Sequence, residues 1–309
     1  MGDPEAPPRS PLVDAHVHVW NPARLSYPWL RGFERLDRPF LPNDIDRAGG
    51  ATTRHVFVQA GCRVEQASEE VRWVTGMTDA WPELAAIVAD ADLRSGSGLE
   101  SHLDALVALG ERDARLRRVR VAGIRHLLQD EPDELLNDSG STSALLDGLR
   151  VLAERAMTFD VCVRHRQLDT VIDVLERVPE LNVVLDHLGK PPVDDGIHST
   201  AGHAWARAID RLALLPRAHV KLSGLAAEAS SSQALDDHAH EFLAHALRAF
   251  APQRSMIGSD WPVSALTGAG GTFAGWRERV MRATLDAGFE DADLAAIEHV
   301  TAERFYSLS

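Results

Sequence analysis

Residues 55–79 read HVFVQAGCRVEQASEEVRWVTGMTD, a short apolar run followed by a longer amphipathic segment. The run His55–Gln59 is β-branched and aromatic at its centre, as expected of a strand that is covered on both faces. The segment Val64–Asp79 has the apolar spacing of a helix. A strand followed by a helix is the unit from which parallel sheets are built.

The same unit recurs along the whole chain. Strand-like runs are expected at Leu12–His18, His55–Gln59, Ala86–Ala91, Val119–Ile124, Val161–His165, Val183–His187, His219–Leu222 and Ser255–Ser259. Most of these runs precede a helical pattern, as at Ser143–Ala156, Asp169–Arg177, Ala204–Leu214, Leu235–Phe250 and Trp276–Ala287. Eight such units in 309 residues predict an α/β fold, a closed (β/α)8 TIM barrel. An open doubly wound sheet is the structural alternative.

Composition and charge exclude several classes of protein. The net charge of −14 argues against non-specific nucleic-acid binding and against anionic membrane surfaces. The chain contains no apolar run of about 18 residues, and its start lacks the features of a secretory signal, so we expect a cytoplasmic protein. Residues 1–10 are predicted to be a disordered leader, and residues 11–309 a single barrel domain. The sequence leaves the oligomeric state open, a homodimer included.

Three predicted strands end in groups that can bind a metal or transfer a proton. Strand one ends in His16 and His18, whose side chains point to the same side because they are two residues apart. Strand six ends in His187, and strand eight ends in Asp260. Each alone has an ordinary structural explanation, a core histidine or a turn aspartate. Because the carboxyl ends of barrel strands share one face, we expect these four side chains to converge there.

Two more strand ends carry polar side chains with open roles. His165 is either a further metal ligand, a hydrogen-bonding residue of the pocket, or a residue of the helix layer. Arg125 offers planar donors for substrate oxygens, or else it forms an ordinary ion pair at the rim. Lys221 is expected to be a charge of the barrel wall that pairs with an acid.

The motifs that surround these residues resemble the amidohydrolase-related barrels, and more narrowly their sugar-lactonase branch. Nearly the whole chain carries the resemblance, through DAHVHVW, SYPWL, RPFLP, VFVQAG, GIRHLLQDEPDELL, VVLDHLGKPPV, VKLSGL and GSDWPV. The branch contains L-rhamnonolactonases, L-fuconolactonases, 4-sulfomuconolactone hydrolases and 2-pyrone-4,6-dicarboxylate lactonases. DHLGKP and GSDWP are specific for the branch, but much less so for the substrate.

The resemblance assigns roles to residues by position. It implies that His16 and His18 are the strand-one histidine pair, that His187 is the histidine of DHLGKP, and that Asp260 is the general base. Around the substrate it places Arg125, Gln129, Arg164, His165, Trp29 and Trp261. Some members hold one Zn²⁺ or another divalent ion and others use none, so metal-dependent and metal-free catalysis both stay open.

The resulting hypothesis is the hydrolysis of a sugar-acid lactone, a small molecule. Asp260 would deprotonate the attacking water, and a metal ion or the pair His187 and Arg125 would stabilise the oxyanion. The alternatives are a metal-dependent decarboxylase of an aromatic or muconate-type acid on the same barrel, and a non-catalytic barrel. A blocked rim, with His16 and Asp260 far apart, would support the last.

Overall fold

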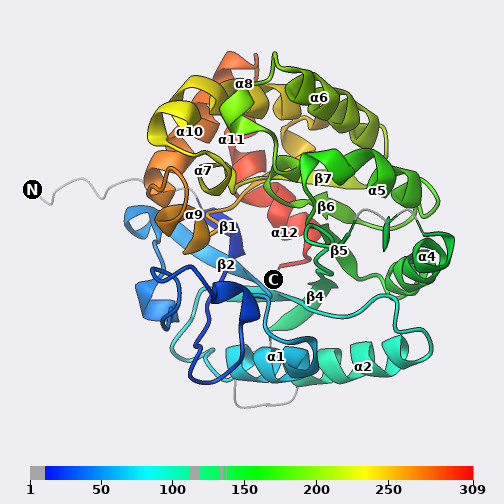
Figure 1. Cartoon of the computed structure of the whole chain (residues 1–309). Helices are drawn as coiled ribbons and strands as arrows, with labels where there is room; N and C mark the ends of the chain where they lie inside the picture. Colours follow the sequence, from blue (N-terminus) through cyan, green and yellow to red (C-terminus); the bar gives the residue numbers. More distant parts are fainter. Residues whose placement is uncertain (1–10, 112–118, 133–134, 137, 309) are drawn as a thin grey trace, which may run out of the picture.

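The computed structural model describes residues 11–111, 119–132, 135–136 and 138–308. The predicted leader, residues 1–10, lies outside this part of the chain. The sheet has eight parallel strands in the order β1 to β8: Leu12–Val17, Thr52–Val58, Leu84–Ala89, Arg120–Ile124, Thr158–Val161, Val183–Leu185, Ala218–Leu222 and Ser255–Ile257. Helices surround the sheet on its outside (Figure 1). This confirms the predicted (β/α)8 barrel.

The barrel closes between β1 and β8 just beyond the end of β8. The Asp260 amide donates to the His16 carbonyl at 2.8 Å, and the His18 amide donates to the Trp261 carbonyl at 2.9 Å. Closure therefore joins the two segments that carry His16, His18 and Asp260.

The helices are α1 Ala67–Thr75, α2 Gly98–Glu111, α4 Ser139–Glu154, α5 Leu168–Leu175, α6 Thr200–Ala213, α7 Leu225–Glu228, α8 Ser232–Phe250, α9 Val263–Leu266, α10 Phe273–Asp286, α11 Asp291–Ala295 and α12 Thr301–Phe305. Four of them, α4, α6, α8 and α10, begin three or four residues before the predicted starts. Each has a polar N-cap residue whose side chain accepts a hydrogen bond from a backbone N–H of the first turn; these residues are Asp138, Ser199, Ser231 and Thr272. Apolar spacing does not mark these polar caps, so the predicted helices start too late. No described helix is long and apolar enough to cross a lipid bilayer.

The predicted ends of three strands are wrong, and all three affect the site. Strand five was expected at Val161–His165, but β5 spans Thr158–Val161 and contains the fully buried Asp160. Strand six was expected to reach His187, but β6 ends at Leu185 and His187 lies in a tight turn with a φ of 54°. Strand eight likewise ends at Ile257, so Asp260 follows the strand, with a φ of 53°.

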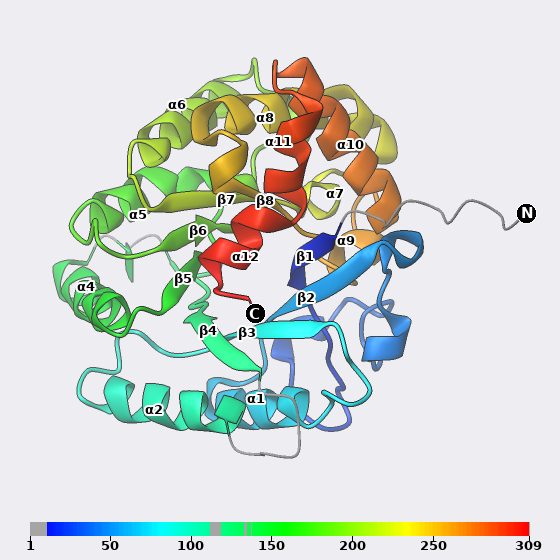
Figure 2. The same cartoon turned by 180° about the vertical axis from the view of Figure 1, so that it is seen from behind.

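The barrel interior is layered along its axis. Small and branched apolar side chains of the strands pack inside the barrel against Phe305 and Tyr306, and together they form an apolar plug. Helix α12 lies across this end of the barrel (Figure 2), as expected for the C-terminal segment. The larger core lies between the strands and the surrounding helices. Above the apolar plug the interior becomes polar and charged, with Asp160, Asp186 and Lys221 all fully buried.

Candidate active site and metal centre

Four side chains from the ends of β1, β6 and β8 meet at the mouth of the barrel. The Asp260 Oδ1 atom lies 3.8 Å from His16 Nε2, 3.5 Å from His18 Nε2 and 3.6 Å from His187 Nε2. The two Nε2 atoms of His16 and His18 are 3.1 Å apart. The structure thus brings the four residues together as expected, and the separation of His16 from Asp260 argues against a non-catalytic barrel.

The other ring nitrogen of each histidine points away from this cluster toward a fixed partner. His18 Nδ1 donates to the Val58 carbonyl at 2.7 Å, and because a carbonyl only accepts, His18 Nε2 carries a lone pair. His187 Nδ1 lies 2.9 Å from Ser223 Oγ. His16 Nδ1 lies 3.3 Å from the Asp186 carboxylate. Such outer partners orient the rings and present Nε2 to the centre of the site.

A close approach of backbone allows this packing of the His187 ring. Gly224, which follows β7, has a φ of 78°, and a Cβ there would lie 2.4 Å from His187 Cγ. A glycine is therefore required beside the ring, for sterics as well as for backbone conformation.

Burial sets the charges of the cluster. Desolvation lowers the pKa of His16 and of His18, and it lowers the pKa of His187 to about 4, so the imidazoles are neutral at pH 7. Burial alone would raise the pKa of Asp260, but the surrounding histidines, His187 first, lower it below the ordinary range of aspartate. Ser264 Oγ donates to the other oxygen, Oδ2, at 2.7 Å. Asp260 is therefore an oriented, ionised carboxylate.

This donor set fits a divalent cation. Bonds of 2.0–2.1 Å around a tetrahedral zinc ion place its ligand atoms roughly 3.3 Å apart. The four separations of 3.1–3.8 Å bracket that value. Among the described residues, two groups of three metal-competent side chains have their ligand atoms within 4.8 Å of one another. They are His16, His18 and Asp260, and His16, Asp186 and His187.

Beneath the cluster lies a buried network of charges. Lys221 Nζ contacts Asp160 Oδ2 at 2.5 Å, Asp186 Oδ1 at 3.0 Å and His16 Nδ1 at 3.1 Å. The Tyr306 hydroxyl donates to Asp160 Oδ2 at 2.8 Å. The pairing of Lys221 with an acid is confirmed. The network supports His16 from below and connects it to the apolar plug.

A cavity of about 710 Å³ opens above the cluster. Its floor contains His18, His187 and Asp260, and one wall is aromatic, with Trp20, Trp29 and Phe33 from the β1–β2 connection. Trp29 is fixed there by its Nε1–H bond to the Ala60 carbonyl at 2.8 Å. Of the predicted substrate contacts, the cavity contains Trp29, Arg125, Gln129 and Arg164.

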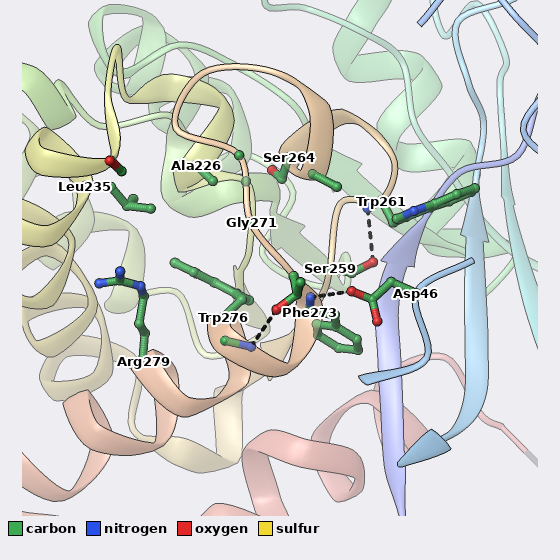
Figure 3. Close-up of a pocket in the computed structure, with 16 residues that line it drawn as sticks. Asp46, Ala226, Leu235, Ser259, Trp261, Ser264, Gly271, Phe273, Trp276 and Arg279 are labelled. Carbon is green, nitrogen blue, oxygen red and sulfur yellow. Dashed lines mark hydrogen bonds between the residues drawn. The ribbon is translucent and has the colours of Figure 1, made fainter. Parts of the chain in front are cut away.

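Trp261 lies in a different place from the one expected. It lines a second, smaller cavity of about 170 Å³, together with Ser259, Ser264 and Trp276 (Figure 3). Its backbone N–H donates to Ser259 Oγ at 3.0 Å, and its ring packs edge-on against Phe40. Trp261 therefore helps to close the barrel and to support the loop that carries Asp260.

His165 does not join the metal-competent groups. Because the strand ends four residues earlier than expected, His165 begins a short 3₁₀ helix, His165–Gln167. Its Nδ1 donates to the Lys190 carbonyl at 3.0 Å. Of the three roles left open for it, the structure thus supports hydrogen bonding.

Sequence reasoning missed several residues of the site. Lys190 and Glu228 form an ion pair in the cavity, with Nζ and Oε1 3.0 Å apart, and Ser264 donates a hydrogen bond to Asp260. Asp186 and Asp160 complete the buried network. The signals were weak: Lys190 and Asp186 belong to the DHLGKP motif, and Glu228 lies in a polar stretch that follows a predicted strand.

Comparisons with known proteins agree with this geometry. A family model described as amidohydrolase matches residues 13–308. An L-fucono-1,5-lactonase of Burkholderia multivorans is 32% identical over 304 residues, 96% of each chain. An L-rhamnono-gamma-lactonase of Scheffersomyces stipitis is 27% identical over 199 residues, 59% of this chain and 57% of that one. A zinc-bound crystal structure of an amidohydrolase from B. multivorans superposes with a TM-score of 0.77 at 30% identity. It covers 96% of this chain and 99% of that one.

Proposed function

Because the chain belongs to the amidohydrolase family, we propose that it hydrolyses the ester bond of a small neutral lactone of a sugar acid. The observation that carries the proposal is the position of Asp260. Its ionised carboxylate faces three neutral imidazoles on the floor of a substrate-sized cavity. Water activation beside an electrophilic centre is the chemistry that ester hydrolysis needs.

The cavity suits an uncharged polyol ring. Its volume of about 710 Å³ lies within the range of small-ligand pockets. The rings of Trp20 and Trp29, 5.4 Å apart and nearly perpendicular, offer apolar surface to the C–H groups of a sugar. The cations around the cavity are paired with carboxylates, which favours a neutral substrate. The names of the relatives from Burkholderia and Scheffersomyces support an aldonolactone.

In the proposed mechanism Asp260 acts first as base and then as acid. The carboxylate takes a proton from water while the water oxygen forms a bond to the lactone carbonyl carbon. When the bond between that carbon and the ring oxygen breaks, Asp260 returns the proton to the ring oxygen. The product is an open hydroxy acid, which ionises in water. The hydrogen bond from Ser264 keeps the carboxylate in one orientation throughout.

Arg125 and His187 are proposed to stabilise the negative charge that develops on the carbonyl oxygen. Both line the cavity beside Asp260. Arg125 is held rigidly, because its Nη2 donates to the Gln59 carbonyl at 2.5 Å and its Nη1 contacts Asp186 at 3.4 Å. A fixed donor of this kind needs no reorganisation during the reaction.

His16, His18 and Asp260 are the residues that would hold a divalent metal ion, with His187 beside them, and zinc is the first candidate because the neighbouring structure contains it. When bound, such an ion supplies Lewis-acid chemistry at the carbonyl oxygen. The chain's own contribution is the fixed ring orientation described above, in which Nδ1 is occupied and Nε2 faces the centre.

The test is a pH-indicator screen of aldonolactones and muconolactones, run with and without a chelator. Proton release that depends on the enzyme and is lost in Asp260→Asn is the expected result. In parallel, CO₂ is measured with aromatic and muconate-type acids. Release of CO₂ without ring opening of any lactone would show that the decarboxylase alternative is correct.

A further inference from the structure

The main cavity contains three cationic side chains, and each contacts a carboxylate. The pairs are Arg125–Asp186 at 3.4 Å, Lys190–Glu228 at 3.0 Å and Arg164–Asp130 at 3.1 Å. The pair Arg125–Asp186 is buried. The second lies within the cavity, with side chains 15% and 20% exposed. The third is at the outer rim, where the side chains are 36% and 69% exposed.

The backbone fixes Lys190 in place. Its φ of 52° is rare for a residue with a side chain, and its amide donates to the His187 carbonyl at 2.9 Å. Its own carbonyl accepts the bond from His165. Burial lowers the pKa of the ammonium group, but Cys162, Glu228 and Asp260 together outweigh burial and raise it above the usual value. Lys190 is therefore a charged group that cannot easily leave the cavity.

The position of Glu228 is fixed in a different way. It is the last residue of α7, which packs against α9, the helix that contains Ser264. The Ala226 carbonyl of α7 accepts a bond from the Ala269 amide at 2.8 Å. Helix α7 is therefore held on both sides, and Glu228 projects from it to within 3.0 Å of the Lys190 ammonium group.

We propose that Glu228 is a specificity-determining residue, which neutralises Lys190 and thereby makes the cavity selective for uncharged lactones over lactones that bear a carboxylate. This inference rests on the proposed function and adds to it the charge class of the substrate. A partly buried ammonium group without a partner binds an anion strongly, because little water screens it. With Glu228 present, an incoming carboxylate is repelled by a charge of its own sign and must displace Glu228 to reach Lys190.

The test is Glu228→Gln, which keeps the size of the side chain and removes its charge. The two probes have the same ring configuration: L-fuconolactone carries a methyl group where L-galactarolactone carries a carboxylate. We expect the ratio of kcat/KM for the carboxylate lactone to that for the methyl lactone to rise about tenfold or more. The matched control is Asp130→Asn, which frees Arg164 at the exposed rim, where solvent screening makes the rise smaller.

The double variant Lys190→Met/Glu228→Gln tests whether the ammonium group causes the gain. It should lose the gain, since position 190 no longer supplies a cation. Equal changes for both probes in Glu228→Gln, or a gain that survives in the double variant, would overturn the inference.

A binding measurement separates this inference from the proposed function. Calorimetry with the galactarate dianion should show tighter binding to Glu228→Gln than to the unmodified protein, again by about tenfold. If no lactone is hydrolysed but this difference is present, the proposed function fails and the charge selectivity stands. If lactones are hydrolysed and the difference is absent, the charge selectivity fails alone.

Discussion

The Nε2 atoms of His16 and His18 lie 3.1 Å apart in a fully buried setting. His18 Nε2 carries a lone pair, because its Nδ1 proton is committed to the Val58 carbonyl. At this distance the His18 lone pair can accept a hydrogen bond from His16 Nε2 or face a bound cation. The Asp260 carboxylate, 3.5 Å from His18 Nε2, supplies a negative charge that favours a cation.

The first prediction concerns metal content. The protein, loaded with ZnCl₂ and dialysed, should retain a single zinc ion per chain by elemental analysis, and His18→Ala should retain none. The matched control is His165→Ala, which should retain zinc because His165 donates to the Lys190 carbonyl instead. Retention of zinc by His18→Ala would place the ion elsewhere.

The second prediction concerns the base. Asp260→Asn should lower kcat by about 10²–10⁴-fold with little change in KM, because an amide cannot accept the proton. Ser264→Ala removes only the bond to Oδ2 and should lower kcat by about tenfold, the effect of one hydrogen bond. Initial rates by pH indicator measure both. Equal losses in the two variants would contradict the assignment of Asp260 as base.

The third prediction concerns the buried network. Lys221→Met leaves Asp160 without its cation and Asp186 with Arg125 alone, and it should destabilise the protein by about 3–5 kcal/mol. Tyr306→Phe removes one hydrogen bond to Asp160 and should cost about 1–3 kcal/mol. Urea denaturation at pH 7 measures both. A smaller effect for Lys221→Met than for Tyr306→Phe would mean that the lysine is not needed to neutralise the acids.

The fourth prediction concerns Glu70 in α1, which accepts bonds from the Tyr27 hydroxyl at 3.3 Å and the Ala60 amide at 3.2 Å. Burial raises its pKa from 4.5 to about 8, so the native state binds more protons than the unfolded state between these values. This contribution to stability is present at pH 4.5 and is lost as pH rises toward 8.

Glu70→Gln keeps the acceptor and removes the titration. The variant should match the unmodified protein in Tm near pH 5 and exceed it near pH 9. Thermal denaturation across this range gives the comparison. A difference in Tm that is the same at both ends would show that Glu70 does not titrate in the folded state.

Much of the fold was predictable because strands that are buried on both faces need continuous apolar runs. Each of the eight runs overlaps a strand of the barrel, although the run Val161–His165 shares only Val161 with β5. The prediction failed at strand five because Asp160 interrupts the apolar pattern of Thr158–Val161. A buried aspartate is tolerated there because Lys221 reaches it from β7 and the Tyr306 hydroxyl donates to it. The sequence pattern around Asp160 cannot reveal a partner that lies on another strand.

The sequence by itself determined the barrel and the identity of His16, His18, His187 and Asp260 as a converging set. The reason is that parallel strands deliver their carboxyl ends to one face. Only the tertiary structure decided which atoms meet. The closing bonds between β1 and the segment after β8, and left-handed turns at His187, Lys190 and Asp260, set the distances. The same turns separated His165 from the metal-competent groups and paired Lys190 with Glu228. Periodicity could not predict these contacts, because the direction of the backbone after a strand depends on tertiary packing.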